Sequence, residues 1–346
     1  MMKYDIYKNK VENLYQMAGA KGLYYLGKDF LSLQTFPEQV NSKPRSIQIE
    51  VTSICNIKCK MCYINELGKY RADHMKFETF KKIIDENFNH WHLIRMWGIG
   101  DPFTNPDIMK MIAYEKELGN AVNLSSNLML LNEDKVKELV RLKVDRLNIS
   151  IDGATAETYE SIRRGAKFDK LLENLALLKK YNNGVINLCV VSVSMKENLH
   201  ELKDLVRLVK RFGIKRLFIQ EVQVGKDGQD ESIINDDSSL KFVDDANKVL
   251  EEAVALGKGI GVKVVAPKVY ARDKRTECVW PWLQTYVTYN GLVTPCCRNI
   301  YEKHYVCGDL NNENLSDIWN NKKYHNFRKQ LFKGPLPEQC KDCTML

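Results

Sequence analysis

The sequence predicts an α/β fold: a partial (β/α)6 barrel of the TIM type, followed by a small C-terminal domain held together by metal. Three observations lead to this prediction. From about residue 46, short β-rich runs alternate with amphipathic helical stretches, which is typical of a parallel sheet with helices outside it. The expected strands alternate apolar with polar residues, unlike the continuous apolar runs of strands buried on both faces. After about residue 270 this alternation stops and Cys, Trp, Pro and Gly become dense, as in small domains that need a metal for stability.

The β-α units can be placed in order along the chain. Strands are expected at 46–51, 92–98, 121–125, 145–151, 185–193 and 215–221. The helices between them include 77–88, 133–142, 168–181 and 199–212. A further strand at 261–266 is expected to leave the barrel. These elements divide the chain into an N-terminal helical extension at 1–44, the barrel at 45–268 and the C-terminal domain at 269–346.

The alternation within the strands predicts a polar lumen. In the first strand Ile47 and Ile49 interleave with Gln48 and Glu50, and later strands repeat the pattern. The apolar face can pack on helices, whereas the polar face must line water or a ligand. An open barrel fits this pattern better than a filled eight-stranded core.

Composition limits the possible classes of protein. The chain has 346 residues and a formal net charge of +8, but its lysines are spread among acids, as in 241–252, so we expect a solvated surface and no nucleic-acid partner. No apolar run is long enough to span a membrane, and the polar start does not resemble a secretory signal, so we expect a cytoplasmic protein. Of the ten cysteines, three lie within eight residues near the front and six follow from Cys278 onward, with Cys189 alone between them. Clustered thiols in a reducing compartment indicate metal ligands rather than disulfides.

Three of these cysteines directly follow the first strand. Cys55, Cys59 and Cys62 have C-x3-C-x2-C spacing, in a loop at the carboxyl end of a parallel strand, where the active sites of such folds are built. Three thiolates in one loop can hold three irons of a cubane cluster and leave the fourth iron open. The alternatives are a zinc site with a distant fourth ligand, and a disulfide or inert core role.

This motif resembles that of the radical S-adenosylmethionine (SAM) superfamily, and the resemblance covers about residues 44–346. It implies that the open iron chelates the amino and carboxylate groups of SAM. An electron from the cluster, supplied by a flavodoxin- or ferredoxin-type reductant, then cleaves SAM to a 5′-deoxyadenosyl radical. That radical removes a hydrogen atom from the substrate.

Further landmarks of the superfamily follow at the ends of later strands. The segment 98–102 resembles the Gly-Gly-Glu-type loop that holds the amino group of SAM, with Asp in place of the commoner Glu. The resemblance implies SAM contacts from Gly98, Gly100, Asp101, Asn127, Ser150 and Arg163. One departure is Met61, which stands where an aromatic residue often lies against the adenine.

A second set of cysteines resembles the auxiliary-cluster domains called SPASM and twitch. The proposed ligands are Cys278, Cys296, Cys340 and Cys343. The later cysteines of the full SPASM pattern do not follow, so the set matches the shorter twitch type, which is similar to that of the 2-deoxy-scyllo-inosamine dehydrogenase type. This implies a second, fully ligated [4Fe–4S] cluster. A structural zinc held by the same thiolates is the alternative, and Cys189 and Cys307 are expected to be buried, unreactive thiols.

A fully ligated second cluster favours a two-electron oxidation, because it can accept an electron from a substrate radical. We expect a radical SAM oxidoreductase that acts on a small molecule such as a sugar or cyclitol alcohol. Candidate bases facing the lumen are Glu221 and Asp152, with Arg298 as an anchor beside the second cluster. Glu50 is expected to be a structural hydrogen-bonding partner near the first cluster.

Three other functions remain open. The protein could modify a ribosomally made peptide. It could catalyse a redox-neutral epimerisation in which Cys297 donates a hydrogen atom. Outside enzymology, it could be an iron–sulfur electron carrier or a zinc-held nucleic-acid module, although neither role needs the SAM-type loops at 98–102 and 150–163.

Overall fold

The computed structural model describes residues 38–40, 43–62, 73–88, 92–222, 244–267, 278, 280–297, 305–337, 340 and 343. The expected helical extension at 1–44 lies almost entirely outside these residues. The described helices include none that is both long and apolar enough to cross a membrane.

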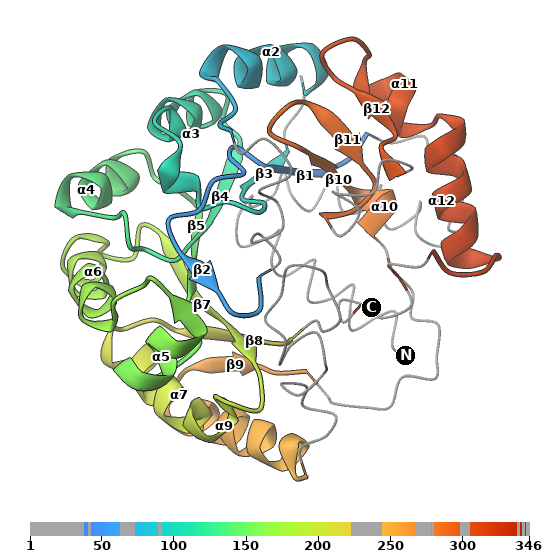
Figure 1. Ribbon diagram of the computed structural model, residues 1–346. Helices are drawn as coiled ribbons and strands as arrows, with labels where there is room; N and C mark the ends of the chain where they lie inside the picture. The colour runs from blue at the N-terminus through green and yellow to red at the C-terminus, as the bar shows by residue number, and fades with distance from the viewer. Residues whose placement is uncertain are drawn as a thin grey trace.

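One curved sheet organises the molecule, with helices along its outer side (Figure 1). Its strands run in the order β12-β11-β10-β1-β3-β4-β5-β7-β8-β9. The six expected barrel strands are confirmed as β1 (Ser46–Ile49), β3 (Leu93–Met96), β4 (Ala121–Ser126), β5 (Arg146–Ser150), β7 (Asn187–Ser194) and β8 (Arg216–Glu221). All of their neighbouring pairs are parallel, as the partial (β/α)6 barrel requires.

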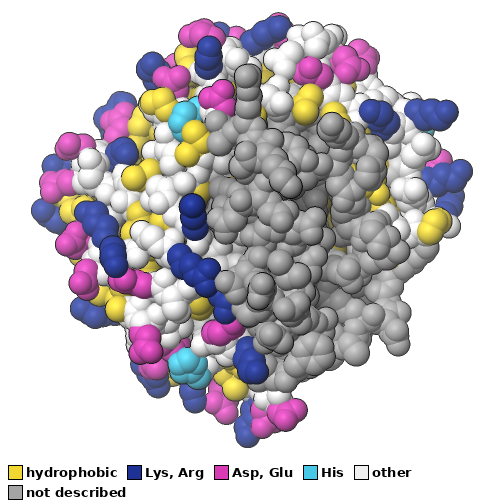
Figure 2. Space-filling view, in the orientation of Figure 1, with side chains coloured by type: hydrophobic (Ala, Val, Ile, Leu, Met, Phe, Trp, Pro, Cys, Tyr) yellow, Lys and Arg dark blue, Asp and Glu magenta, His cyan; other side chains and the backbone are white. Residues whose placement is uncertain are grey.

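The helices cover the apolar face of this sheet. They are α2 (Phe77–Asn87), α3 (Ile108–Glu117), α4 (Glu133–Arg141), α5 (Ala156–Ile162), α6 (Phe168–Tyr181), α7 (Leu202–Arg211) and α9 (Ala246–Ile260), with short 3-10 turns η2 (Pro102–Thr104) and η3 (Leu199–Glu201). Local signals start some of them: the Asn132 side chain, for example, accepts a hydrogen bond from the Lys135 N–H at the start of α4. On the exposed rim that these helices form, Lys and Arg are mixed with Asp and Glu (Figure 2).

Alternate strand residues separate the core from the lumen. Ile47, Ile94 and Leu147 have no exposed surface, because they pack under the helices. In β5 the opposite face, formed by Arg146, Asn148 and Ser150, is only partly buried. The polar face is therefore partly accessible to solvent on β5, whereas Gln48 of β1 and Asn123 of β4 on the same face are buried.

The strand near residue 263 does not leave the barrel. Instead β9 (Lys263–Val265) pairs in parallel with β8 and extends the sheet, so this expectation was wrong. The helix before it, α9, packs against α7 and β9. It thus serves as one more crossover of the same kind, which returns the chain to the sheet edge.

The C-terminal region continues the sheet on the other side. The strand β10 (Gln284–Val287) pairs in parallel with β1, and β11 (Leu292–Thr294) and β12 (Gly308–Asp309) follow in antiparallel order. Three helices pack beside them, α10 (Trp280–Leu283), α11 (Leu315–Trp319) and α12 (Lys322–Phe332) (Figure 1). The strand pairing thus crosses the domain boundary that the sequence suggests near residue 268.

A separate two-stranded ribbon lies beside the main sheet. It joins β2 (Lys58–Cys59) in antiparallel pairing to β6 (Arg163–Arg164). The pairing places Cys59 opposite Arg163, although they are 104 residues apart in the chain. The ribbon therefore fixes the cysteine loop to the segment after α5.

Candidate active site

The cysteine loop lies directly after β1, at the carboxyl ends of the parallel strands. Cys55, Cys59 and Cys62 are all partly buried. The Cys62 N–H donates to the Cys59 carbonyl over 3.0 Å, which closes a tight turn between the last two cysteines. The three thiols therefore come from one short segment, and their role as cluster ligands stays a prediction.

Two of these thiols receive hydrogen bonds from side chains outside the loop. Arg163 Nη1 lies 3.7 Å from Cys59 Sγ, and Asn127 Nδ2 lies 3.8 Å from Cys55 Sγ. Hydrogen bonds to cluster sulfurs, and the charge around them, tune the reduction potential of an iron–sulfur cluster. Thiols in this setting are chemically suited to a cluster whose sulfurs carry negative charge.

Partial burial also affects the ionisation of two of the thiols. Burial raises the pKa of Cys55 to about 11, and burial likewise raises the pKa of Cys59, against the opposing charge of Arg163. Because iron binds the thiolate form, cluster assembly must release protons from these groups. Neither Cys55 nor Cys59 is therefore a low-pKa thiol of the reactive type.

Arg163 is held by a buried ion pair. Its Nη2 lies 2.7 Å from Asp152 Oδ2, and the two side chains are 9% and 0% exposed. Burial opposes the charge on Arg163, yet the Asp152 carboxylate raises the pKa of Arg163 above its ordinary value. The other Asp152 oxygen accepts from the Val193 N–H at 2.7 Å. Asp152, expected as a base, is therefore engaged in holding Arg163.

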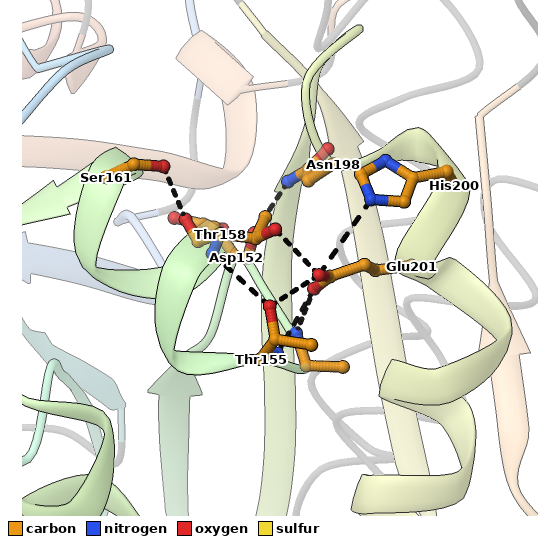
Figure 3. Close-up of polar contacts among 8 residues, drawn as sticks. Asp152, Thr155, Thr158, Ser161, Asn198, His200 and Glu201 are labelled. Carbon is orange, nitrogen blue, oxygen red and sulfur yellow. Dashed lines mark hydrogen bonds and ion pairs between the residues drawn. The ribbon is translucent and has the colours of Figure 1, made fainter.

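A second network supports the loop that carries Asp152 (Figure 3). The Glu201 carboxylate accepts from the hydroxyls of Thr155 and Thr158, each at 2.6 Å, and from the N–H of Ala154 at 2.6 Å. Burial alone would raise the pKa of Glu201, but these hydrogen bonds lower it. Asn198 Nδ2 also donates to the Asp152 carbonyl at 2.9 Å. The network fixes the start of α5 and, through Asp152, the position of Arg163.

The glycine-containing loop after β3 packs against the cysteine loop. The Gly100 N–H donates to the Thr52 carbonyl at 3.3 Å, and the Asp101 N–H donates to the Ile54 carbonyl at 3.0 Å. A Cβ at Gly100 would overlap the backbone oxygen of Ile54 and come within 2.6 Å of that of Thr52. Only glycine permits this approach, so the SAM-type loop and the first cysteine are fixed to each other.

The Asp101 side chain bonds to protein groups. Its Oδ2 accepts from Ser126 Oγ and from the Asn127 N–H, both at 2.8 Å, and its Oδ1 accepts from the Phe103 N–H at 3.0 Å. Asp101 thereby positions Asn127 beside Cys55. A SAM contact from this loop is therefore assigned, as a proposal, to its backbone rather than to the Asp101 carboxylate.

A buried carboxyl–phenol pair joins the two halves of the protein. Tyr286 on β10 donates through its hydroxyl to Glu50 Oε2 at 2.5 Å, and Glu50 is only 1% exposed. Burial raises the pKa of Glu50 from 4.5, the ordinary value, to about 7. A Cβ at Gly98 would overlap the Tyr286 hydroxyl, so this glycine makes room for the pair. The hydrogen bond that the sequence suggests for Glu50 is present.

The structure describes two of the remaining candidate residues, Ser150 and Glu221, but not the third, Arg298. Ser150 ends β5 on the partly exposed face. Along β8, alternation puts Glu221 on the face opposite Phe218, which is 39% exposed. Glu221 is thus on the same face as the buried Leu217 and Ile219. The role of Glu221 as a base stays a prediction. Arg298 lies outside the described residues.

The second set of cysteines lies in the C-terminal region. Cys278, Cys296, Cys297 and Cys340 are partly buried, whereas Cys343 is buried. Across the part of the chain that the structure describes, no three His, Cys, Asp or Glu side chains converge to hold a single metal ion. A cubane cluster instead takes each thiolate on a different iron. The assignment of these cysteines as ligands stays a proposal.

Comparison with known proteins agrees with this arrangement. The sequence matches the radical SAM superfamily over residues 49–209 and a SPASM iron–sulfur cluster-binding domain over residues 278–344. It is 26% identical over 317 residues to the tungsten-containing aldehyde ferredoxin oxidoreductase cofactor-modifying protein of Pyrococcus furiosus, across 86% of this chain and 87% of that one. It is 24% identical over 310 residues to the PqqA peptide cyclase of Gluconobacter oxydans, across 87% and 83% of the two chains.

Solved structures share the fold. Native anSMEcpe with bound AdoMet (SAM) aligns with a TM-score of 0.67 at 21% identity, covering 86% of each chain. BtrN in complex with AdoMet and 2-DOIA aligns with a TM-score of 0.52 at 17% identity, covering 85% of this chain and 89% of that one. The protein is thus a member of the radical SAM superfamily with a C-terminal SPASM-type domain, a combination that implies SAM and two [4Fe–4S] clusters as cofactors.

Proposed function

We propose that this radical SAM enzyme oxidises a small polar substrate by two electrons in the barrel lumen. When bound, the cofactors supply the 5′-deoxyadenosyl radical that removes the hydrogen atom and an acceptor for the electron that follows. One observation carries the proposal: the cysteine loop, with Arg163 and Asn127 on two of its thiols, ends a strand whose sheet has a partly exposed polar face.

Different residues near the cysteine loop would ligate the first cluster and contact SAM. Cys55, Cys59 and Cys62 would ligate the first cluster, while Arg163 and Asn127 hydrogen-bond to its ligands. The backbone at Gly98 and Gly100 and the Ser150 side chain would contact SAM. In the C-terminal domain the second cluster would be held by Cys278, Cys296, Cys340 and Cys343.

Glu50 is our candidate for accepting the substrate proton in place of Asp152 and Glu221. The oxidation removes a hydrogen atom, a proton and an electron, so it needs a base. A carboxyl group whose pKa is about 7 can gain and lose a proton near neutral pH. Glu50 also precedes the first cysteine loop in the chain and bonds to Tyr286 on β10 of the C-terminal region.

The first electron must come from outside the chain. A flavodoxin- or ferredoxin-type protein is the proposed physiological reductant, because cluster-driven cleavage of SAM consumes a low-potential electron. In the experiment below, dithionite replaces this partner.

A peptide substrate is the second candidate. Similarity to the PqqA peptide cyclase, across 87% of this chain, favours it. Turnover of a peptide with no turnover of small alcohols would establish this candidate and refute the first.

Redox-neutral epimerisation is the third candidate. It would use Cys297 as a hydrogen donor. Burial lowers the pKa of Arg95, and the nearby Cys297 thiol opposes this shift. Incorporation of solvent deuterium at a carbon, with no change in oxidation state and lost in Cys297→Ala, would establish it.

The test uses the full chain, prepared and reconstituted anaerobically. About eight irons per chain are expected for two cubane clusters. With dithionite and SAM, the enzyme should form 5′-deoxyadenosine and convert a small alcohol to a product about two mass units lighter. Cys59→Ala should abolish 5′-deoxyadenosine. The matched control is Cys307→Ala, because that buried thiol bonds to the Tyr305 carbonyl and is no proposed ligand. Absence of 5′-deoxyadenosine from the wild type would refute the proposal.

A further inference from the structure

The two-stranded ribbon β2–β6 has an inner face and an outer face. Its register places Cys59 opposite Arg163 and Lys58 opposite Arg164. Because neighbouring residues of a strand point to opposite faces, Cys59 and Arg163 share one face, and Lys58 and Arg164 share the other. Burial agrees with this division, since Arg163 is buried whereas Lys58 and Arg164 are exposed. The backbone of the ribbon therefore lies between Cys59, a proposed ligand of the first cluster, and a cationic outer surface.

Three chain segments form a cationic patch around this outer face. They are 56–60 with β2, 163–167 with β6, and 195–198 after β7, and together they contain six cationic side chains and one acidic side chain. The third segment joins the ribbon through Lys60, whose Nζ lies 2.5 Å from Glu197 Oε1. Lys and Arg side chains lie over the position of β2 on the face shown in Figure 2. These three segments are the ribbon patch.

The ribbon patch has more positive charge than its ion pairs neutralise. Arg163, Lys167 and Lys60 each have a carboxylate partner. None of the ion pairs among the described residues includes Lys58 or Lys196, and both of these lysines are exposed. Lys58 also lies directly opposite another cation of β6, and like charges in this position weaken a strand pair. The surplus charge is therefore on the solvent side of the ribbon.

The position of the ribbon patch suits the delivery of an electron. Cleavage of SAM consumes an electron that must come from outside the chain, at a low potential. Electron transfer between proteins slows as the distance between their redox centres grows, and Cys59 lies on the inner face of the same ribbon. A donor protein with negative charge around its redox centre would be attracted and oriented by a positive surface.

A nucleic acid fits the ribbon patch less well. The three segments contain no aromatic side chain on which a base could stack. The Glu197 carboxylate also lies among the cations, paired with Lys60, where it would repel phosphate groups. A small cationic surface of this kind is better suited to a protein partner that carries its own separate acidic side chains.

We propose that the ribbon patch is the docking surface of an acidic one-electron donor protein, which reduces the first cluster. The donor loses one electron and the cluster gains it, with no bond formed or broken and no proton moved. The inference rests on the proposed function only in that the electron comes from an external protein. It goes beyond that proposal because it assigns the surface on which the donor binds and the charge that the donor carries.

The test compares protein donors with a small reductant, using the reconstituted full chain and saturating SAM. The protein donors are an acidic flavodoxin and an acidic ferredoxin, each reduced beforehand and tested separately. The small reductant is photoreduced 5-deazariboflavin, which is uncharged and needs no docking surface. The measured quantity is the rate of 5′-deoxyadenosine formation with a protein donor divided by the rate with 5-deazariboflavin. This ratio removes any effect of a substitution on the cluster itself. For the wild type it should fall as sodium chloride is added, because salt screens exposed charges.

Charge reversal decides whether the ribbon patch is the docking surface. The double variant Lys58→Glu with Lys196→Glu should lower the ratio about tenfold, because reversing charges at an interface slows association. If the double variant does not fold, Lys196→Glu alone should lower it about threefold. The matched control is Lys258→Glu. Lys258 is an exposed lysine in the last turn of α9, at the opposite edge of the sheet, and it likewise belongs to none of the described ion pairs.

A binding measurement makes the test independent of enzyme activity. The oxidised donors are labelled with a dye, and their binding to the reconstituted protein is followed by fluorescence anisotropy. Binding should weaken in the patch variants by about the same factor as the ratio, and should be unchanged in Lys258→Glu. If the patch variants leave both the ratio and the binding of both donors unchanged, the proposal is refuted. Binding of an RNA that is lost in the patch variants, with an unchanged ratio, would refute it in favour of a nucleic-acid surface.

The failure of this inference can be told apart from the failure of the proposed function. Oxidation of a small alcohol is measured in the same preparations with 5-deazariboflavin as the reductant. If the oxidised product forms and charge reversal has no effect on the donors, the docking surface is wrong. If charge reversal weakens donor binding and no alcohol is oxidised, the docking surface stands and the proposed oxidation is wrong.

Discussion

Glu50→Gln should change how the stability of the protein depends on pH. The folded protein raises the pKa of Glu50 from 4.5 to about 7, chiefly by burial. At pH values between 4.5 and about 7, Glu50 is therefore protonated in the native state but ionised in the unfolded chain. Stability contributed by this proton is fully present below pH 4.5 and is lost as the pH rises toward 7.

The magnitude follows from the size of the shift. From 4.5 to about 7 is roughly 2.5 pH units, and each unit corresponds to about 1.4 kcal/mol. The wild-type free energy of unfolding should thus lose about 3 kcal/mol from this group between pH 4.5 and pH 8. Glutamine cannot ionise, so the variant does not lose this stability as the pH rises. Any other effect of the substitution on stability should be the same at every pH.

The measurement is urea denaturation of reconstituted protein at several pH values between 5 and 8, under anaerobic conditions. The quantity of interest is the wild-type free energy minus that of Glu50→Gln, which should fall with rising pH. Glu86→Gln, on an exposed position of α2, controls for the loss of one carboxyl group. Tyr286→Phe removes a hydrogen bond that lowers the pKa of Glu50, so it should extend the loss to higher pH. A difference between wild type and Glu50→Gln that stays constant with pH would refute the reasoning.

Three further predictions test the support of the cysteine loop. Asp152→Asn breaks the buried ion pair with Arg163 and should cost about 3–5 kcal/mol of stability in urea denaturation, with less bound iron; unchanged stability would contradict it. Gly100→Ala should lower the iron content because its Cβ overlaps backbone of the loop, whereas Gly259→Ala on α9 meets no atom within 4 Å and should retain full iron. Glu201→Gln should cost about 2 kcal/mol at pH 7. Because the folded pKa of Glu201 is lowered from 4.5, this difference from wild type should shrink as the pH falls below that value; a constant difference would contradict the assignment.

Local patterns in the sequence predict much of the barrel and the position of the cysteine loop. Apolar–polar alternation in β1 correctly separates Ile47, under the helices, from Gln48 on the polar face. The loops after β1 and β3 are expected to meet because the carboxyl ends of parallel strands share one edge of a sheet. The contact between Gly100 and the Ile54 backbone shows that they do.

Long-range pairing could not be predicted in the same way. The ribbon β2–β6 has strands of two residues, too short for any periodicity, yet it brings Arg163 to Cys59. The hydrogen bond between Tyr286 and Glu50 joins residues 236 positions apart, and β10 shows no signal of its preference for β1.

The parallel pairing of β10 with β1 has a mechanical consequence. Four consecutive residues of each strand are in register. The hydrogen bond between Tyr286 and Glu50 adds a buried side-chain contact between the same two strands' ends. A hinge motion between β1 and β10 would have to break backbone hydrogen bonds and at the same time expose the buried Glu50 carboxyl group. The pairing of β1 with β10 should therefore stay intact during turnover. In the proposed oxidation, electrons would then cross between the two halves over a constant path, and substrate would enter by another side.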